Sequence, residues 1–362
     1  MKSKKCMVAV IALWAVLVLS SWLLPDQAES ESERRPLAQL PELSVKSVLS
    51  GAFMDKFEEY TLDQFPLRDS FRSLKAMFHT WGMRQQDSNG IYIHDGYAAK
   101  MEYPLNAASL KHVLGRFNHL YEKYLTGSKV YMAVVPDKNY YLSPLSGRLS
   151  LDYEALLSGI QEGMPWAEQI DLTEVLSLED YYRTDTHWRQ ENLLPAAQRI
   201  CASLGIEPPR AEDFTVTVLE KPFRGVYRGQ SALPLGTDTL RLMESDVLKQ
   251  CRVYDHETGN YFPVYDLEKL TSKDLYDVYL GGAKALLTIE NPAASTDREL
   301  IVFRDSFGSS MIPLLAANYA KVTVADIRYI GIDLLDRFVE FQGQDVLMLY
   351  STLILNNSSA IK

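Results

Sequence analysis

The strongest constraint on the fold is an alternation of short, almost wholly apolar runs with longer segments whose apolar residues recur at helical spacing. The apolar runs, each expected to be a strand, cover residues 129–136, 299–303, 322–327 and 345–355, and a further strand is expected near 167–172. The segments with helical spacing cover 67–84, 107–125, 153–162, 190–204 and 308–318. Strands that are apolar throughout lie inside parallel sheets with both faces covered. The pattern therefore predicts an α/β fold with helices on both faces of a parallel sheet.

Residues 208–290 interrupt this alternation. Short apolar stretches there are broken by Gly and Pro, which indicates a mostly β insertion. The chain has 362 residues, and single α/β domains of roughly 250 residues or more are common, so length does not fix the number of domains. We expect one domain over 46–362 that carries the insertion, preceded by a tether over 25–45.

The N-terminus has the pattern of a membrane segment. Three lysines among the first five residues precede an uncharged apolar stretch over 7–24, which Pro25 ends. That length is near the lower limit for a membrane span, and flanking lysines stay in the cytoplasm. The pattern predicts a cytoplasmic stub over 1–6 and a single-pass anchor in the cell membrane, with the bulk of the chain extracytoplasmic. No clear small-x-small cleavage site follows the stretch, which favours an uncleaved anchor over a removed signal.

Composition excludes some partners and cofactors. The net charge of -10 and the pI near 5.2 leave no basic surface for nucleic acid. The six histidines are scattered, and no Cys/His set has metal-ligand spacing, so no metal or other cofactor is expected. Cys201 and Cys251 would both be exported; they either form one disulfide or are buried free thiols.

Two short motifs together contain a nucleophile, a base and an acid. They are Thr184-Asp185-Thr186-His187-Trp188 and Arg304-Asp305-Ser306-Phe307-Gly308. A serine hydroxyl is a poor nucleophile at neutral pH unless an imidazole takes its proton and a carboxylate orients that imidazole. In an extended segment, side chains two positions apart lie on one face. Asp185 could therefore orient His187, and His187 could activate Ser306.

The position of Ser306 between a strand and a helix favours a catalytic role. Ligands of α/β sheets bind at the carboxyl ends of the strands, and a helix N-terminus directs amide groups toward a developing oxyanion. The alternative is that Asp305 or Ser306 only caps the helix. Arg68-Asp69-Ser70-Phe71 repeats the tetrapeptide inside a helical segment that follows no strand. The context of Ser306, and not the tetrapeptide, therefore supports catalysis.

All these pieces, in this order, resemble the DHHW protein family, which is distantly similar to the SGNH-hydrolase-like proteins that O-acetylate alginate. The resemblance runs from about Arg34 to the C-terminus. It rests on Glu33-Arg34-Arg35-Pro36-Leu37, Leu40-Pro41-Glu42-Leu43-Ser44, Asp63-Gln64-Phe65-Pro66-Leu67-Arg68, Asp185-Thr186-His187-Trp188, Tyr276 to Gly282, Arg304-Asp305-Ser306-Phe307-Gly308 and Val324-Ala325-Asp326-Ile327-Arg328-Tyr329. It implies an SGNH-hydrolase-like sheet and a triad of Asp185, His187 and Ser306.

The chain departs from the family pattern at two places. Gly281-Gly282-Ala283 stands where the family typically has Gly-Gly-Asn. An asparagine amide is a common oxyanion donor, so its loss would leave that role to the Ser306 backbone N–H and another donor. Arg304 stands where ordinary SGNH esterases have glycine, although lysine or arginine is common among DHHW relatives.

Five further residues are weaker candidates for binding the oxyanion or the substrate: Arg328, Tyr329, Lys138, Arg304 and Gly282. Arg328 could reach the crevice, but a salt bridge to Asp326 or a surface role explains it equally well. Lys138 resembles a position near the active cleft of the family, whereas a solvated lysine is the default expectation.

The resemblance implies an extracytoplasmic SGNH-like serine O-acetyltransferase or acetylesterase that acts on a cell-envelope polysaccharide through an acyl-serine intermediate. By analogy with alginate acetylation, its partner would be an integral-membrane acyl donor protein. The alternative is a non-catalytic envelope protein that binds glycan or scaffolds an assembly, and Ala283 in place of asparagine favours it.

Overall fold

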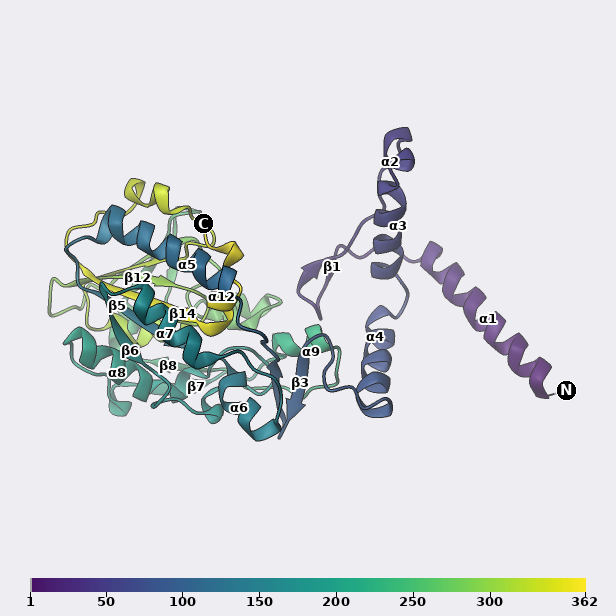
Figure 1. Ribbon diagram of the computed structural model, residues 1–362, viewed down its shortest axis with the longest axis horizontal. Helices are drawn as coiled ribbons and strands as arrows, with labels where there is room; N and C mark the ends of the chain where they lie inside the picture. Colours follow the sequence, from purple (N-terminus) through teal and green to yellow (C-terminus); the bar gives the residue numbers. More distant parts are fainter. Residues whose placement is uncertain (1) are drawn as a thin grey trace. The chain divides into compact units, whose positions relative to one another are not determined.

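The computed structural model describes residues 2–362, which form two compact units (Figure 1). The first unit contains the chain up to Asn89 together with Arg228–Leu235. The second contains Gly90–Tyr227 and Gly236–Lys362. Met1, the first residue of the expected cytoplasmic stub, lies outside the described residues.

The first unit is helical apart from one short hairpin. Helix α1 (Lys2–Leu23) contains a stretch, Lys4–Leu23, that is long and apolar enough to cross a membrane. The hairpin pairs β1 (Glu29–Ser30) with β2 (Arg35–Pro36). Helices α2 (Val45–Leu49), α3 (Ala52–Asp63) and α4 (Arg68–Met77) follow, and a π-helical turn (Phe78–Gly82) continues α4. The helix expected over 67–84 is therefore confirmed, with its last turn widened.

An eight-stranded sheet forms the centre of the second unit, in the order β10-β9-β11-β13-β12-β14-β5-β6. The strands are β5 (Val130–Val135), β6 (Ala167–Asp171), β9 (Arg252–Asp255), β10 (Asn260–Pro263), β11 (Leu286–Glu290), β12 (Glu299–Arg304), β13 (Lys321–Ala325) and β14 (Asp345–Ser351). From β13 to β6 every neighbouring pair is parallel. The predicted α/β sheet is confirmed, and its apolar runs are buried in the sheet.

Helices cover both faces of this sheet, as expected. Those with residues in the two cores of the sheet are α5 (Ala107–Leu120), α7 (Tyr153–Gly163), α8 (Leu194–Leu204), α10 (Asp246–Gln250), α11 (Gly308–Ala316) and α12 (Thr352–Asn356). The second unit also contains α6 (Lys138–Ser146), whereas α9 (Val226–Ser231) leads into the segment that belongs to the first unit. Successive residues of a strand point to opposite faces. Ala133 of β5 accordingly packs in a core with α8 and α11, whereas its neighbour Met132 packs in a second core with α5 and α7.

The segment 208–290, expected to be a mostly β insertion, contributes strands to two sheets. Only β7 (Thr215–Val218) and β8 (Arg241–Glu244) form a separate two-stranded sheet in this segment. Strands β9, β10 and β11 instead join the main sheet, where β11 pairs antiparallel with β13. The reason is that a strand at the end of the parallel set exposes unpaired backbone groups, and the apolar β11 covers them.

Two smaller features of the second unit are a hairpin and a pair of cysteines. The hairpin joins β3 (Ile91–His94) to β4 (Tyr97–Lys100). Cys201 and Cys251 are buried free thiols, which is one of the two alternatives left open. Burial raises the pKa of Cys201 to about 12 and that of Cys251 to about 11, so both thiols stay protonated and unreactive at neutral pH.

Candidate active site

Asp185, His187 and Ser306 form one hydrogen-bonded chain in the second unit. His187 Nδ1 lies 2.7 Å from Asp185 Oδ1, and His187 Nε2 lies 2.8 Å from Ser306 Oγ. With the proton on Nδ1, the imidazole donates to the carboxylate and accepts from the serine hydroxyl. Asp185 is fully buried and Ser306 is partly exposed. The structure thus brings together the three residues that the two motifs supply.

A tight hairpin presents the acid and the base. Tyr181 and Trp188 form an antiparallel bridge, and the Tyr182 N–H donates to the His187 carbonyl (3.0 Å). The backbone at the tip bends, and the His187 N–H donates to Asp185 Oδ1 (3.1 Å). The prediction that Asp185 and His187 meet is right. The backbone between them is bent and not extended, because the Asp185 carboxylate binds the backbone two residues ahead and closes a turn.

A second segment, which contains Gly225 and Val226, is hydrogen-bonded to the tip of this hairpin. The Val226 N–H donates to Asp185 Oδ2 (2.7 Å), and the Gly225 N–H donates to Thr184 Oγ1 (3.0 Å). Asp238 accepts bonds from the Thr184 N–H (2.7 Å) and hydroxyl (2.6 Å). Both oxygens of the buried Asp185 carboxylate therefore have donors, which stabilises the ionised form. Sequence reasoning missed these residues, because they lie about 40 or more positions away.

Gly225 is expected to be irreplaceable at this crossing. A Cβ at Gly225 would lie 2.1 Å from the Thr184 carbonyl carbon and oxygen and 2.3 Å from the Asp185 nitrogen. Because these are backbone atoms, the hairpin itself would have to move. We expect Gly225→Ala to lower the free energy of unfolding by about 3 kcal/mol, measured by urea denaturation.

The matched control is Gly115→Ala. Gly115 is exposed inside α5, and a Cβ there would meet nothing within 4 Å. Alanine in a helix interior should raise stability by about 0.5–1 kcal/mol. Equal stabilities of Gly225→Ala and the wild type would contradict the described crossing.

Aromatic rings hold the imidazole from its faces. The Tyr276 ring stacks on the His187 ring with centroids 3.9 Å apart and planes within 7°. The Tyr276 hydroxyl and Ser310 Oγ are 2.7 Å apart, and Trp188 Nε1 donates to the same oxygen (2.9 Å). Stacking on Tyr276 therefore restrains the orientation of the imidazole. No role was expected for Tyr276, although its segment belongs to the family resemblance.

The turn at the nucleophile is shaped by Asp305. Its carboxylate accepts bonds from the Phe307 N–H (3.0 Å) and from the Ser351 N–H and hydroxyl (2.7 and 2.6 Å). The N-cap of α11 is Phe307, which has no side-chain cap of its own; Asp305 binds the Phe307 N–H just before the helix begins, and Ser306 caps nothing. Within residues 2–362, the Ser306 backbone N–H has no acceptor. That N–H is therefore available to bind an oxyanion.

Arg304 and Gly282 lie behind this turn. Arg304 is fully buried, and its Nη2 and Nη1 atoms donate to the carbonyls of Gly282 and Asp305, each at 3.3 Å. Desolvation lowers the pKa of Arg304. Leu280, Gly281 and Gly282 all adopt positive φ angles, 54°, 70° and 84°. The expectation that Arg304 binds substrate is wrong: its guanidinium is sealed from solvent and links the glycine loop to the nucleophile turn.

Arg328 forms a salt bridge to Asp326, one of the alternatives left open for it. Its Nε and Nη2 atoms donate to the two carboxylate oxygens of Asp326 at 2.8 and 2.6 Å. Tyr329, whose ring lies 5.4 Å from the Arg328 guanidinium, is 49% exposed. In the described part of the chain, no hydrogen bond joins either residue to Asp185, His187 or Ser306. Ligand contact by Tyr329 therefore stays a prediction, and Arg328 forms an ion pair with Asp326.

Lys138 is buried, contrary to the expectation of a solvated lysine. Its Nζ donates to the Tyr182 carbonyl (2.7 Å) and lies 4.9 Å from the centre of the Tyr227 ring. Across residues 2–362 no carboxylate lies within 4.0 Å of it. Desolvation lowers the pKa of Lys138 to about 7, and the carboxylates of Asp185 and Asp238 only partly offset this. Lys138 thus supports the base of the hairpin and does not reach the substrate.

This burial predicts a pH dependence of stability. The pKa of Lys138 falls from 10.5 to about 7 on folding, so between these pH values the folded chain binds fewer protons than the unfolded chain. The free energy of unfolding therefore rises with pH in this window. Lys138 should raise the free energy of unfolding by up to about 1.4 kcal/mol per pH unit, and Lys138→Met should lack this contribution. Urea denaturation between about pH 7 and pH 9 measures both slopes. Lys249→Met, at an exposed lysine of α10, should keep the wild-type slope; equal slopes in all three proteins would refute the prediction.

Comparisons with known proteins agree with the fold. Residues 176–325, which include all three residues of the chain of hydrogen bonds, match the DHHW protein family model. A DHHW family protein from Eubacterium siraeum DSM 15702 has 20% identity and a TM-score of 0.63, over 76% of this chain and 95% of that chain. PatB1 of Bacillus cereus has 17% identity and a TM-score of 0.58, over 73% and 96%. A second structure of that protein, with a sulfonyl adduct, has 18% identity and a TM-score of 0.55, over 73% and 95%.

The resemblance to the DHHW family and the SGNH-like fold are therefore confirmed. None of the curated protein sequences compared with the chain matches it. At these identities the structural similarities show the fold alone. The chemistry has to be argued from the site.

Proposed function

We propose that the second unit is a serine O-acetyltransferase or acetylesterase that acts on a cell-envelope polysaccharide through an acyl-serine intermediate. The observation that carries the proposal is the 2.8 Å contact between Ser306 Oγ and His187 Nε2, with Asp185 on the other ring nitrogen. This is hydrogen-bond reach for proton transfer. The partly exposed Ser306 follows β12, at the sheet edge where α/β folds bind ligands.

The proposed reaction has two halves. In the first, Ser306 Oγ attacks the acyl carbonyl as His187 Nε2 takes the hydroxyl proton, and the Ser306 N–H stabilises the oxyanion. The imidazolium then gives its proton to the leaving group, and the acyl group remains on Ser306. In the second, His187 removes the proton of an acceptor hydroxyl, whose oxygen attacks the acyl-serine; the bond to Ser306 Oγ breaks, and the imidazolium returns the proton to Ser306 Oγ. Asp185 keeps the ring oriented and stabilises its charge throughout.

The substrate class rests on the family resemblance and on α1. A membrane anchor with its lysines inside would hold the second unit outside the cytoplasm, next to envelope glycans. An acyl group supplied there would come from an integral-membrane donor protein. If a sugar hydroxyl is the acceptor, the protein is a transferase; if water is the acceptor, it is an esterase.

A second candidate function is supported by Ala283. This residue is exposed and lacks the amide that relatives present after the two glycines. Loss of one oxyanion donor costs on the order of a hundredfold in rate, so a protein with this loop could retain the fold to bind glycan or a partner. The two functions make opposite predictions for a serine-directed reagent.

The test uses the full-length chain in detergent. A fluorophosphonate that reports active serines should label the wild type, and a chromogenic acetyl ester should be hydrolysed faster than in buffer. If the wild type shows no labelling and no turnover, catalysis is refuted and the binding function remains. The assay has to detect slow turnover, because the missing amide predicts a weak enzyme.

A further inference from the structure

The helices of the first unit have only a small core, in which Ala76 packs against Ala232 and Leu233. Apart from Ala76, none of the residues in α2, α3, α4 and the following π turn is buried. Exposed large apolar side chains there are Leu40, Leu43, Val45, Val48, Leu49, Met54, Leu62, Leu67, Phe71, Leu74, Phe78, Trp81 and Met83. Helices this short are marginal in water, and most helical stability comes from packing an apolar face. Something outside the described contacts must therefore cover them.

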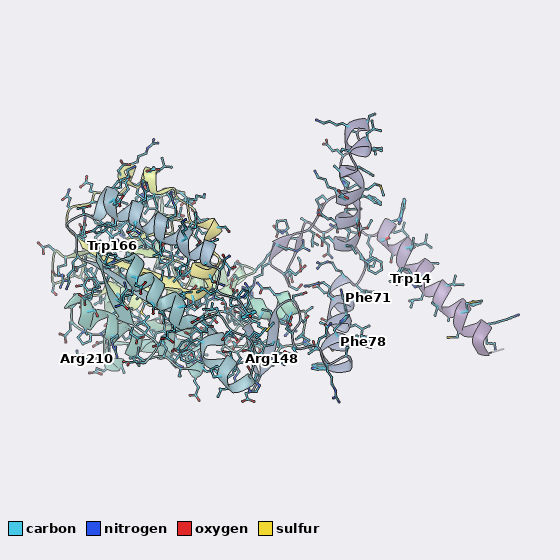
Figure 2. All side chains as sticks on the ribbon, viewed as in Figure 1. Trp14, Phe71, Phe78, Arg148, Trp166 and Arg210 are labelled. Carbon is cyan, nitrogen blue, oxygen red and sulfur yellow. The ribbon has the colours of Figure 1, made fainter. Side chains whose placement is uncertain are left out.

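Five of these side chains form one continuous stripe. Leu67, Phe71, Leu74, Phe78 and Trp81 are 68%, 43%, 59%, 60% and 60% exposed. The spacing of three and four residues places Phe71, Leu74 and Phe78 on one side of the helix, with Leu67 at its N-cap and Trp81 in the π turn that follows. Phe71 and Phe78 both project from α4 (Figure 2). We call these five residues the α4 stripe. Removing these partly exposed apolar side chains from water would be favourable.

Hydrogen bonds hold the start of α4 close to the end of α1. Only a few residues after Leu23, Asp26 accepts a bond from the Tyr60 hydroxyl (3.0 Å), and the Gln27 N–H donates to Gln64 Oε1 (2.9 Å). Tyr60 lies near the end of α3 and Gln64 follows it, just before α4 begins. If α1 crosses a membrane, the residues next to the bilayer surface are therefore bonded to the residues that lead into α4.

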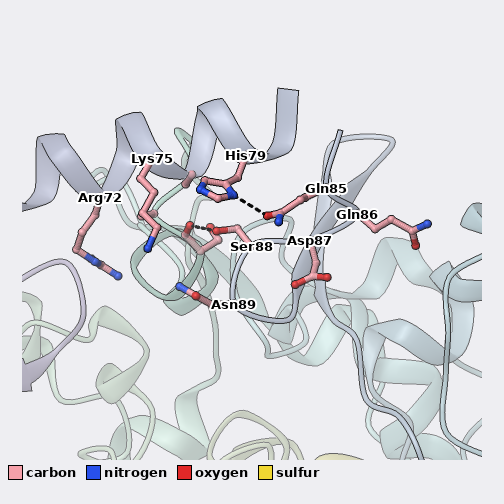
Figure 3. A pocket seen from close by; sticks show the side chains of 11 residues that line it. Arg72, Lys75, His79, Gln85, Gln86, Asp87, Ser88 and Asn89 are labelled. Atoms are coloured by element: carbon pink, nitrogen blue, oxygen red, sulfur yellow. Dashed lines mark hydrogen bonds between the residues drawn. The ribbon is translucent and has the colours of Figure 1, made fainter. Parts of the chain in front are cut away.

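The charges beside the stripe fit a lipid head-group region. Arg72, Lys75 and His79 project from α4 and its π turn toward the loop that carries Ser88 and Asn89 (Figure 3). They line a cavity of about 670 Å³. Arg72 pairs with Glu33 (3.0 Å), whereas Lys75 has no partner within the described residues. Basic side chains flanking an apolar face with Trp and Phe are typical of helices that lie in a membrane interface.

We propose that the α4 stripe lies in the outer interface of the same membrane that α1 spans, with the exposed Lys75 beside it at the level of the head groups. The first unit is then a membrane-bound platform that tethers the second unit. This inference does not depend on the proposed chemistry. The spacing of the stripe would also suit a coiled coil, so a protein partner or a second copy is an outcome that the experiment must separate.

The experiment places an environment-sensitive nitrobenzoxadiazole probe on single cysteines of the full-length chain. Cys6→Ser removes the exposed native cysteine, while Cys201 and Cys251 are buried. Phe78→Cys reports the stripe, and Asp69→Cys, on the opposite side of the same helix, is the matched control. The protein is reconstituted in phosphatidylcholine–phosphatidylglycerol vesicles. Quenching is measured with nitroxide-labelled lipid and with iodide in the water.

We expect lipid nitroxide to quench the Phe78 probe several-fold more than the Asp69 probe, and iodide to show the reverse order. Leu74→Cys should behave like Phe78→Cys, which guards against a local effect of one substitution. Equal access of iodide to both faces would overturn the proposal, because the stripe would be in water. Protection of the stripe from both quenchers would also overturn it, because protein would then cover the stripe.

Discussion

Ser306→Ala is expected to reduce acetyl-ester turnover to the uncatalysed background, a loss of up to about 10⁶-fold in a serine enzyme of this kind. The substitution removes the oxygen that lies 2.8 Å from His187 Nε2, so no acyl-serine can form. Because Ser306 is only partly buried and caps no helix, the variant should fold. Turnover and fluorophosphonate labelling are measured side by side with thermal unfolding.

The chain contains a matched control for this substitution. Ser70 occupies the same place in the second copy of the tetrapeptide, Arg68-Asp69-Ser70-Phe71, and lies exposed in α4. Ser70→Ala should keep full labelling and turnover. If Ser306→Ala also keeps them, the nucleophile is another residue and the proposed mechanism fails.

Asp185→Asn should lower kcat by about 10⁴-fold while the protein remains folded. The carboxylate accepts from His187 Nδ1 on one oxygen and from the Val226 N–H on the other, at 2.7 Å each. Either orientation of an asparagine amide turns its NH₂ toward one of these donors. When it faces the ring, Nδ1 must accept, the proton moves to Nε2, and His187 can no longer take the Ser306 proton.

The measurement is single-turnover acylation together with steady-state kcat. Asp336→Asn, at an exposed aspartate outside the site, is the control and should leave kcat unchanged. A wild-type kcat in Asp185→Asn would show that the buried carboxylate does not orient the base.

The parts of the site that could be predicted are those with local signals. A strand of apolar residues, a polar turn and a helix follow one another along the chain, so the position of Ser306 between strand and helix follows from the order of residues alone. The pairing of Asp185 with His187 could be predicted because only one residue separates them. Its geometry could not, because the Asx-type bond that bends the backbone competes with the extended form.

The remaining features depend on contacts between distant segments. The burial of Lys138 under the Tyr182 carbonyl and the crossing of Gly225 over Thr184 join residues that are more than 40 positions apart. Nothing in the local pattern of either residue distinguishes it from a surface lysine or a loop glycine. For the same reason the pairing of β11 with β13, which draws part of the expected insertion into the main sheet, could not be predicted from periodicity.

The central claim is that Ser306 carries the acyl group, and trapping that intermediate tests it most directly. The full-length chain is mixed with a chromogenic acetyl ester, stopped with acid during the first turnovers, digested and analysed by peptide mass spectrometry. The account predicts one acetyl group on the peptide that contains Ser306, and much less of it in His187→Ala, which lacks the base. Ester turnover by the wild type with an unmodified Ser306, or equal acetylation in His187→Ala, would contradict the account.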